Sequence, residues 1–440
     1  MVTTGFDHAA AGTPRATWTG SARWPQVPVW TPPDGPASLL VVAAHPDDES
    51  LGAGGVIARL AGAGWQVVVV VATDGEGSHP ASPTLGPEAL AARRRGEADD
   101  AIARLGTGIS VHHLGLPDGR LETHEDELVE RLVDLIGEDG AQHTLLAPWR
   151  QDPHTDHRAA GRAARQAAHR TDGQLLEYPI WAWHQLLPAD LPWERALRVE
   201  LTDEERRRKA DAIAAHSSQV LPLSDDPRDR AVVTPDMLSH FEGADEVYLA
   251  TEPGPPPTPF EDLHSRVADP WRVDDSWYER RKRAVLLGAL PDATYASALE
   301  IGCSVGALTQ DLAGRCRHVT AIDLSAAAVA RARHRLVGFD WVTVERRTVP
   351  DELPDGPFDL VVLSEVGYFL SPRELDATIA ALEPTRLAGA VVACHWLHPV
   401  RGWPLDGAAV HRRLREAWGR PVVRHLERDF LLEVWQGGSS

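Results

Sequence analysis

Short apolar runs alternate with longer amphipathic segments through the first half of the chain. Continuous apolar runs such as residues 38–44 and 67–72 are typical of strands buried in a parallel sheet. Strands that alternate with helices imply crossover connections and a sheet covered on both faces. The pattern predicts strands at 38–44, 67–72, 109–114 and 144–147, with helices at 54–63, 87–105 and 125–137.

The same alternation restarts in the second half. A helix is predicted at 276–290, followed by strands at 297–301, 319–322, 340–344, 360–364 and 390–394. Between the halves, residues 251–261 are rich in proline, which fixes φ and removes a donor, so they are predicted to be a linker. Residues 1–35 lack periodicity and form an N-terminal arm that either lies on a domain or is disordered. We therefore expect two Rossmann-like α/β domains with parallel sheets, at 36–250 and 262–440, that are not copies of one repeat.

Composition narrows the class of protein. The chain of 440 residues is 43% hydrophobic and 25% charged, as in globular proteins. Its longest strongly apolar run, residues 65–72, is far shorter than the roughly 20 residues of a membrane helix. The first thirty residues lack a basic start followed by an apolar stretch, and three cysteines are too few for a disulfide framework. We expect a cytoplasmic protein without a membrane span.

The net charge of −20 argues against nucleic acid as a partner, because phosphate binding needs a surplus of basic residues. The oligomeric state stays open.

Two polar groups follow predicted strands of the first domain. His45-Pro46-Asp47-Asp48-Glu49 comes directly after the first strand, and His154-Thr155-Asp156-His157 follows the strand at 144–147. Chemistry in open α/β sheets concentrates at these carboxyl ends. His45, Asp48 and His157 would form the two-histidine, one-carboxylate set of a catalytic metal site. Asp47 would then take a proton from metal-bound water. The alternative is a pair of polar turns that cap helices.

These residues resemble the LmbE-like (PIG-L) N-acetylglucosaminyl deacetylases over about residues 38–250. The similarity extends to Gly52-Ala53-Gly54-Gly55, Ala72-Thr73-Asp74-Gly75 and His216-Ser217-Ser218-Gln219. It implies that His45, Asp48 and His157 bind zinc and that Asp47 is the general base. It also implies that His154 stabilises the oxyanion and protonates the leaving amine, with Asp156 orienting His154.

The same resemblance implies an acylated amino sugar or glycoconjugate as substrate. Arg93 or Arg94 is a candidate for contacting it, and a surface salt bridge is the alternative. Sites made of His and Asp also accept Fe(II), Co(II) or Mn(II), so the metal is Zn²⁺ or another divalent ion.

The second domain has its own glycine turn. The strand at 297–301 leads into Gly302-Cys303-Ser304-Val305-Gly306, where backbone can approach a ligand closely. Asp323, at the end of the next strand, is placed to bind both hydroxyls of a ribose. Ser364 and Glu365 end the fourth strand.

This order of a glycine turn, an aspartate and a later Ser-Glu pair resembles that of class I S-adenosylmethionine-dependent methyltransferases. A nicotinamide-binding unit is the alternative. Flanking segments such as Ser276-Trp277-Tyr278-Glu279 resemble those of the nodulation-type N-methyltransferases, which act on a deacetylated chitooligosaccharide. Glu365 or a nearby histidine would accept the proton of the amine, and Tyr278 either contacts a ligand or packs in the core. The resemblance implies S-adenosylmethionine contacts at Glu300, Gly302, Cys303, Ser304, Gly306, Asp323, Ser364 and Glu365.

Together the two halves suggest a bifunctional enzyme that deacetylates an N-acetylglucosamine-type sugar and then methylates the freed amine. Two alternatives stay open. The deacetylase could act on a small-molecule precursor while the methyltransferase serves an unrelated acceptor. The second domain could also bind S-adenosylmethionine or a glycan without catalysis.

Overall fold

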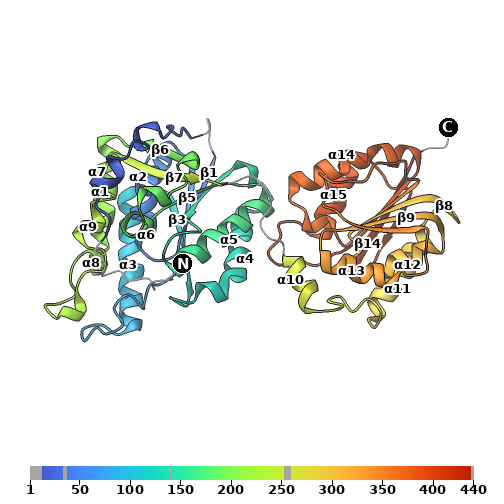
Figure 1. Ribbon diagram of the computed structural model, residues 1–440, viewed down its shortest axis with the longest axis horizontal. Helices are drawn as coiled ribbons and strands as arrows, with labels where there is room; N and C mark the ends of the chain where they lie inside the picture. The colour runs from blue at the N-terminus through green and yellow to red at the C-terminus, as the bar shows by residue number, and fades with distance from the viewer. Residues whose placement is uncertain (1–11, 33–36, 139, 252–258, 438–440) are drawn as a thin grey trace. The chain divides into compact units, whose positions relative to one another are not determined.

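The computed structural model describes residues 12–32, 37–138, 140–251 and 259–437. It divides into two compact units, Met1–Gly254 and Pro255–Ser440 (Figure 1). Residues 252–258 of the predicted linker and residues 1–11 of the predicted arm lie outside the described ranges, so those expectations stay predictions.

The first unit is built on a seven-stranded sheet in the order β3-β2-β1-β4-β5-β7-β6. Strands β1 to β5 are parallel, whereas β7 pairs antiparallel with both β5 and β6. The predicted α/β class with a mainly parallel sheet is confirmed, and the antiparallel edge is a feature that the sequence did not indicate. The strands are β1 (Ser38–Ala43), β2 (Gln66–Thr73), β3 (Ile109–Leu116), β4 (His143–Pro148), β5 (Gln174–Tyr178), β6 (Ala196–Glu200) and β7 (Asp245–Ala250).

Helices cover both faces of this sheet, which explains the continuous apolar runs. In β1, Leu39 and Val41 pack with α2 (Asp48–Gly62), α3 (Pro87–Leu105) and α7 (Asp203–Ala215). Leu40 and Val42 point to the other face, toward α4 (Glu125–Ile136) and α5 (Thr155–Thr171), which lie side by side in Figure 1. Alternate residues of one strand are therefore buried in two separate clusters.

The described part of the N-terminal segment packs onto this unit. Trp18, in the short helix α1 (Arg15–Thr19), is 1% exposed, and its indole donates to the carbonyl of Trp183 at 2.8 Å. Trp183 belongs to α6 (Trp181–Gln185), and two further short helices, α8 (Ser217–Val220) and α9 (Pro235–Leu238), lie between β6 and β7 along the chain. The described residues 12–32 therefore contact this unit, while the prediction for the arm as a whole stays a prediction.

The second unit has a seven-stranded sheet in the order β10-β9-β8-β11-β12-β14-β13. Strand β14 pairs antiparallel with β12 and β13, so this sheet is also mixed. Counted from the first strand of each unit, both sheets follow the order 3-2-1-4-5-7-6, a shared topology that the sequence did not predict. The strands are β8 (Tyr295–Ile301), β9 (Cys316–Asp323), β10 (Val342–Arg346), β11 (Leu360–Ser364), β12 (Ala390–Trp396), β13 (Val423–Leu426) and β14 (Phe430–Gln436).

In both sheets the strand order reverses between the first and fourth strands, at β1/β4 and at β8/β11. Ligands of open α/β sheets bind beyond the strand ends at such a reversal. Helices again cover both faces, and among the described residues no helix is long and apolar enough to cross a membrane. The helices are α10 (Pro259–Arg266), α11 (Trp277–Ala289), α12 (Ala307–Ala313), α13 (Ala326–Arg335), α14 (Pro372–Ala388) and α15 (Gly407–Trp418).

Candidate active sites

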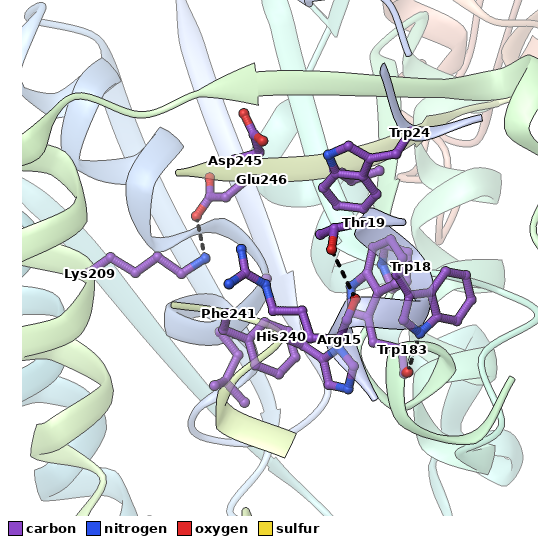
Figure 2. Close-up of a pocket in the computed structure, with 14 residues that line it drawn as sticks. Arg15, Trp18, Thr19, Trp24, Trp183, Lys209, His240, Phe241, Asp245 and Glu246 are labelled. Carbon is purple, nitrogen blue, oxygen red and sulfur yellow. Dashed lines mark hydrogen bonds and ion pairs between the residues drawn. The ribbon is translucent and has the colours of Figure 1, made fainter. Parts of the chain in front are cut away.

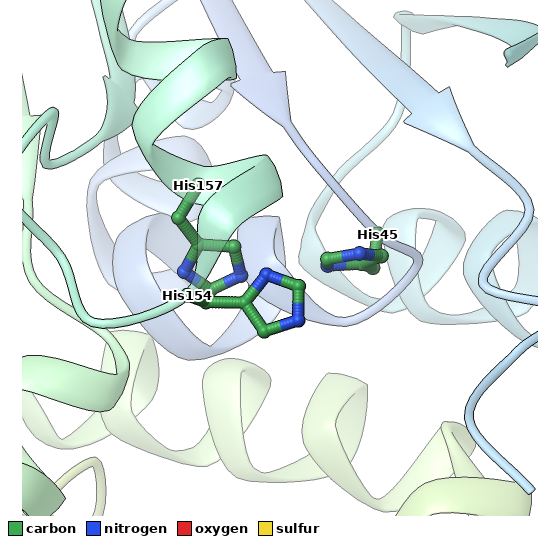
Figure 3. A group of neighbouring side chains, drawn as sticks. All are labelled: His45, His154 and His157. Atoms are coloured by element: carbon green, nitrogen blue, oxygen red, sulfur yellow. The ribbon is translucent and has the colours of Figure 1, made fainter. Parts of the chain in front are cut away.

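Three histidines meet where β1 and β4 end (Figure 3). His45 follows β1, His154 caps the N-terminus of α5, and His157 lies in the first turn of that helix. The ring centroids of His154 lie 4.8 Å from those of both His45 and His157. One nitrogen from each ring falls within 4.8 Å of the others, close enough to share one ion. The reversal of strand order thus brings the two sequence motifs together.

Asp48 lies between two of these histidines. Its Oδ1 is 3.2 Å from Nε2 of His157, and its Oδ2 is 3.6 Å from Nδ1 of His45. Burial opposes its ionised form, but the charge and hydrogen bonds of His157 and His45 hold the pKa of Asp48 well below its usual value. Two imidazoles and one carboxylate in mutual contact are a donor set that fits a divalent metal ion.

Further carboxylates support the two predicted histidine ligands from behind. Nε2 of His45 lies 3.1 Å from Oδ1 of Asp118 and 3.4 Å from Oδ2 of Asp156. Nδ1 of His157 lies 3.1 Å from Oδ1 of the fully buried Asp152. Such contacts fix the orientation and tautomer of a metal-binding imidazole. Asp118 and Asp152 were not singled out from the sequence.

The structure gives Asp156 partners that the sequence did not indicate. Its carboxylate accepts the backbone N–H groups of Gly119 and Leu121, at 2.7 and 3.2 Å, and faces His45. Its backbone N–H donates to Nδ1 of His154 at 3.2 Å. The carboxylate thus contacts His45 and this loop, and its role in orienting His154 stays a prediction.

The contact from the Asp156 backbone determines the tautomer of the His154 ring. Because Nδ1 accepts an N–H, a neutral ring carries its proton on Nε2. Burial, with the charges of His157 and His45, lowers the pKa of His154 to about 2. The ring is therefore suited to donating a hydrogen bond to a developing oxyanion.

Asp47 and Arg94 form the polar wall beside this cluster. Burial raises the pKa of Asp47 to about 6, although the guanidinium of Arg94 opposes the rise. Arg94 is buried and donates to the carbonyls of Gly75 and Pro46, at 2.8 and 2.6 Å. Arg93 instead lies on the surface, where it donates to Glu97 and to Ser217. Of the two arginine candidates, Arg94 lines the cavity and Arg93 forms the surface salt bridge.

A cavity of about 340 Å³ opens over the cluster. Asp47, Arg94 and Asp118 lie on it together with the histidines, and its remaining walls are mainly apolar. This volume is in the range of small-molecule sites. The apolar walls include Ile180, Trp181, Val232, Val233 and Met237.

A second, smaller cavity in the same unit has a different character (Figure 2). Trp18, Trp24 and Trp183 surround it, together with the ion pair of Lys209 Nζ and Glu246 Oε1 at 2.8 Å. Its volume of about 30 Å³ suits one or two water molecules rather than a sugar. None of the predicted site residues lines it.

In the second unit, the turn after β8 adopts the conformation that its glycines allow. Gly302 has a φ of 78°, and a Cβ there would lie 2.0 Å from Cγ2 of Val366. Asp323 ends β9, where its carboxylate accepts the backbone N–H groups of Ser304 and Ser325 at 2.8 and 2.9 Å. Cys303 is buried, and burial raises its thiol pKa well above the usual value, so it is a turn residue rather than a nucleophile.

Buried polar groups at this turn point to an additional ligand. Within the parts of the chain that the structure describes, Ser304 Oγ is buried without a hydrogen-bond partner, and the buried carboxyl of Glu300 is contacted by the hydroxyl of Thr309. Burial also raises the pKa of Glu300 to about 8. Because buried polar atoms are normally paired, this set fits a polar cofactor such as S-adenosylmethionine.

Glu365 follows β11, with a left-handed φ of 58°. Its Oε1 accepts from Nζ of the buried Lys282 at 2.7 Å. Its Oε2 accepts from the backbone of Trp396 at 3.1 Å and from the hydroxyl of Tyr368. Both oxygens are thus engaged, which weakens the expectation that Glu365 takes the proton of the amine. Ser364, the last residue of β11, stays a predicted cofactor contact.

Tyr278 packs in the same region. Its ring stands edge-on to Trp396, with centroids 5.2 Å apart, and Nζ of Lys282 lies 5.0 Å from its centroid. Its buried hydroxyl has no hydrogen-bond partner among the described residues. The ring of Tyr278 therefore packs against its neighbours, and its hydroxyl can bond to a ligand.

Two family models match the chain, one in each unit. Residues 40–168 match the GlcNAc-PI de-N-acetylase (PIG-L) family, and residues 261–385 match the Nodulation protein S (NodS) family. The first match contains both motifs of the histidine cluster, and the second contains the glycine turn, Asp323 and Glu365.

Individual relatives also resemble either the deacetylase family or the nodulation protein S family, not both. Nodulation protein S of Rhizobium tropici is 39% identical over 107 residues, which are 23% of this chain and 43% of that protein. A 1D-myo-inositol 2-acetamido-2-deoxy-alpha-D-glucopyranoside deacetylase of Kineococcus radiotolerans is 47% identical over 90 residues, or 20% of this chain and 24% of that protein. The chain spans about half the length of the nodulation protein S relatives that it matches.

Among solved structures, the N-methyltransferase NodS from Bradyrhizobium japonicum WM9, in complex with S-adenosyl-L-homocysteine, is 26% identical. The match covers 41% of this chain and 98% of that chain, with a TM-score of 0.37.

Proposed function

Because the chain carries a PIG-L deacetylase domain followed by a NodS-like methyltransferase domain, we propose that it is a bifunctional enzyme acting on amino sugars. The first site removes the acetyl group from an N-acetylglucosamine-type sugar or conjugate. The second transfers a methyl group to the freed amine. The observation that carries the proposal is that Asp48 contacts both His45 and His157 beside Asp47, in a cavity large enough for a sugar.

In the first site, a divalent ion held by His45, Asp48 and His157 would supply a Lewis acid and acidify a water molecule. Asp47 takes a proton from the attacking water, and its raised pKa suits it to return that proton to the leaving nitrogen. His154 donates its Nε2–H to the oxyanion that forms at the amide carbon. Acetate and a primary amine are the products.

In the second site, S-adenosylmethionine would supply an electrophilic methyl group. Gly302, Ser304 and Gly306 form the turn that would hold it, and Asp323, which accepts the Ser304 N–H, would bind the ribose hydroxyls. The main task of the protein in such a displacement is to position and desolvate the two partners. Glu365, held by Lys282, lies where the acceptor would arrive.

Mass spectrometry of products from chitooligosaccharides and N-acetylglucosaminyl conjugates tests the sequence of steps. With S-adenosylmethionine present, we expect loss of acetyl followed by gain of methyl on the same molecule. The variant Asp323→Ala should accumulate the free amine, and His45→Ala should leave the acetylated substrate intact but still methylate an amine supplied to it.

Deacetylation without later methylation of the same molecule would contradict the coupling. It would favour a methyltransferase that serves an unrelated acceptor, or a second domain that only binds its ligand.

A further inference from the structure

A buried chain of hydrogen bonds begins at the end of β12 and is not used in the mechanism above. It consists of His395 in β12, His411 in α15 and Glu433 in β14, all 0% exposed. The N–H of Gly367 donates to Nε2 of His395 at 3.1 Å. Nδ1 of His395 lies 3.2 Å from Nε2 of His411, and Nδ1 of His411 lies 2.8 Å from Oε2 of Glu433.

The N–H of Gly367 determines where each proton lies in this series of hydrogen bonds. A backbone N–H can only donate, so Nε2 of His395 is an acceptor and its proton lies on Nδ1. That proton is donated to Nε2 of His411, whose own proton must then lie on Nδ1, facing Glu433. Both rings are therefore neutral and in the Nδ1–H tautomer.

Two arginines beside Glu433 keep the protons of both rings on Nδ1. Arg415 Nη1 lies 2.9 Å from Oε2 of Glu433, and Arg424 Nε lies 3.1 Å from Oε1. These cations hold Glu433 as a carboxylate, which accepts from His411 and cannot donate to it. At the near end, burial and the charge of Lys282 disfavour a second proton on His395 and hold its pKa well below the usual value.

The chain of hydrogen bonds ends on the turn that follows Glu365. Gly367 begins the short 3₁₀ turn Gly367–Phe369, and a Cβ there would lie 2.6 Å from Cγ1 of Val410. Two neighbours of His395 hold Glu365 itself. The carbonyl of Cys394 accepts the Glu365 N–H at 2.9 Å, and the Trp396 N–H donates to Oε2 at 3.1 Å.

Three consecutive residues of β12 thus fix the segment 365–367 against the end of β11. This contact matters because Glu365 has a left-handed backbone, which persists only where surrounding contacts hold it. The segment lies at the reversal of strand order, where the acceptor would meet the methyl donor.

We propose that His395 is a positioning residue for methyl transfer, whose tautomer is fixed by His411 and Glu433 and whose Nε2 holds the turn that carries Glu365 and Tyr368. The proposal rests on the proposed function of the second domain. Misplacement of reacting groups by about 1 Å can cost about 100-fold in rate, so loss of one contact beneath this turn should be visible in kcat.

Kinetics of the full chain test the role. His395→Leu removes the acceptor for Gly367 at similar volume, and we expect kcat for methylation of an amino sugar to fall about 10- to 100-fold. Affinity for S-adenosylhomocysteine, measured by calorimetry, should change less than about twofold, because the turn after β8 and Asp323 are untouched. His395→Gln should recover most of kcat, since its amide oxygen can accept from Gly367.

The matched control is His398→Gln. His398 lies three residues further along and is partly exposed, and its Nε2 is 3.0 Å from Asp429 on the surface. This variant should retain the wild-type kcat. An equal loss in His398→Gln, or wild-type kcat in His395→Leu, would overturn the proposal.

Nitrogen NMR of the wild-type chain, labelled at histidine, provides a readout that does not depend on activity. Two rings, assigned by their loss in His395→Gln and His411→Gln, should show the proton on Nδ1 and should not titrate near neutral pH. A proton on Nε2 of either ring overturns the inference even if methyl transfer occurs. If the tautomers are as expected but no amine is methylated, the proposed function fails, and the positioning role fails with it.

Discussion

Nη2 of Arg94 lies 3.4 Å from Oδ2 of Asp47, and both side chains are buried in the wall of the larger cavity. The same guanidinium holds the carbonyl of Pro46, so Arg94 fixes the turn that carries the proposed base and also stabilises its charge. Arg93, its neighbour in sequence, has no such contact with the turn and pairs on the surface.

The two arginines provide a matched pair of variants. Arg94→Gln removes a charged hydrogen-bonding partner worth about 1.5–3 kcal/mol, so acetate release should fall about 10- to 100-fold. Arg93→Gln should change it less than about twofold, since exposed pairs contribute little. Steady-state acetate release checks both, and equal effects of the two substitutions would refute the assignment of Arg94 to the site.

Asp47→Asn should remove the general base while leaving the metal ligands in place. We expect kcat for acetate release to fall about 10²- to 10⁴-fold, the usual contribution of a positioned base. Metal content, measured by atomic emission, should match that of the wild type. A variant that loses its metal together with its activity would show that Asp47 acts as a ligand instead.

Asp152 should govern metal affinity through His157. Asp152→Asn replaces the carboxylate that faces Nδ1 of His157 at 3.1 Å, and loss of such a contact typically costs 10- to 100-fold in metal affinity. Competition with a chromogenic chelator measures this change. Asp99→Asn, a change at an exposed carboxylate paired with His113, is the control and should leave affinity unaltered.

Removal of the metal should separate the two reactions. Dialysis against a chelator should abolish acetate release and leave methylation of an already deacetylated amine unchanged, because the residues proposed for the second reaction all lie in the second unit. Restoring activity with Zn²⁺, Co²⁺ or Mn²⁺ in turn would rank the metals. Acetate release that survives complete metal removal would exclude the proposed chemistry.

Glu300 should make stability depend on pH in the absence of cofactor. Burial raises its pKa from 4.5 to about 8, so the folded state keeps a proton that the unfolded state loses. Stability should therefore fall as pH rises from about 4.5 through 8, and this component should end above that range. Urea unfolding across this range should show a shallower fall for Glu300→Gln, and identical slopes would contradict the shift.

The apolar pattern predicted much of the fold because both faces of each sheet are covered. The helix expected at 87–105 coincides with α3, since Pro87 can begin a helix and Gly106 follows its end. The antiparallel edges were missed because short strands such as β6 and β13 carry few buried residues and no continuous apolar run. The shared strand order was missed because pairing across a sheet leaves no local signal.

For the sites, sequence indicated the residues that follow strands and missed those that reach them through space. His45 and His157 were identified because each belongs to a motif that follows a strand, and such strand ends meet at one edge. Asp118 and Lys282 act by contact with residues distant in sequence. The direction of the Asp156 side chain depends on the N–H groups of the loop before α4, which no local pattern reveals.

The common strand order of the two sheets has a consequence for experiments with mixed chains. Each set of reactive residues lies at the reversal within its own sheet, so neither site borrows a strand from the other half. A chain inactivated at His45 and a second chain inactivated at Asp323 should therefore complement each other in one tube. The rate of that complementation, compared with the intact chain, would measure how freely the amine escapes between the two reactions.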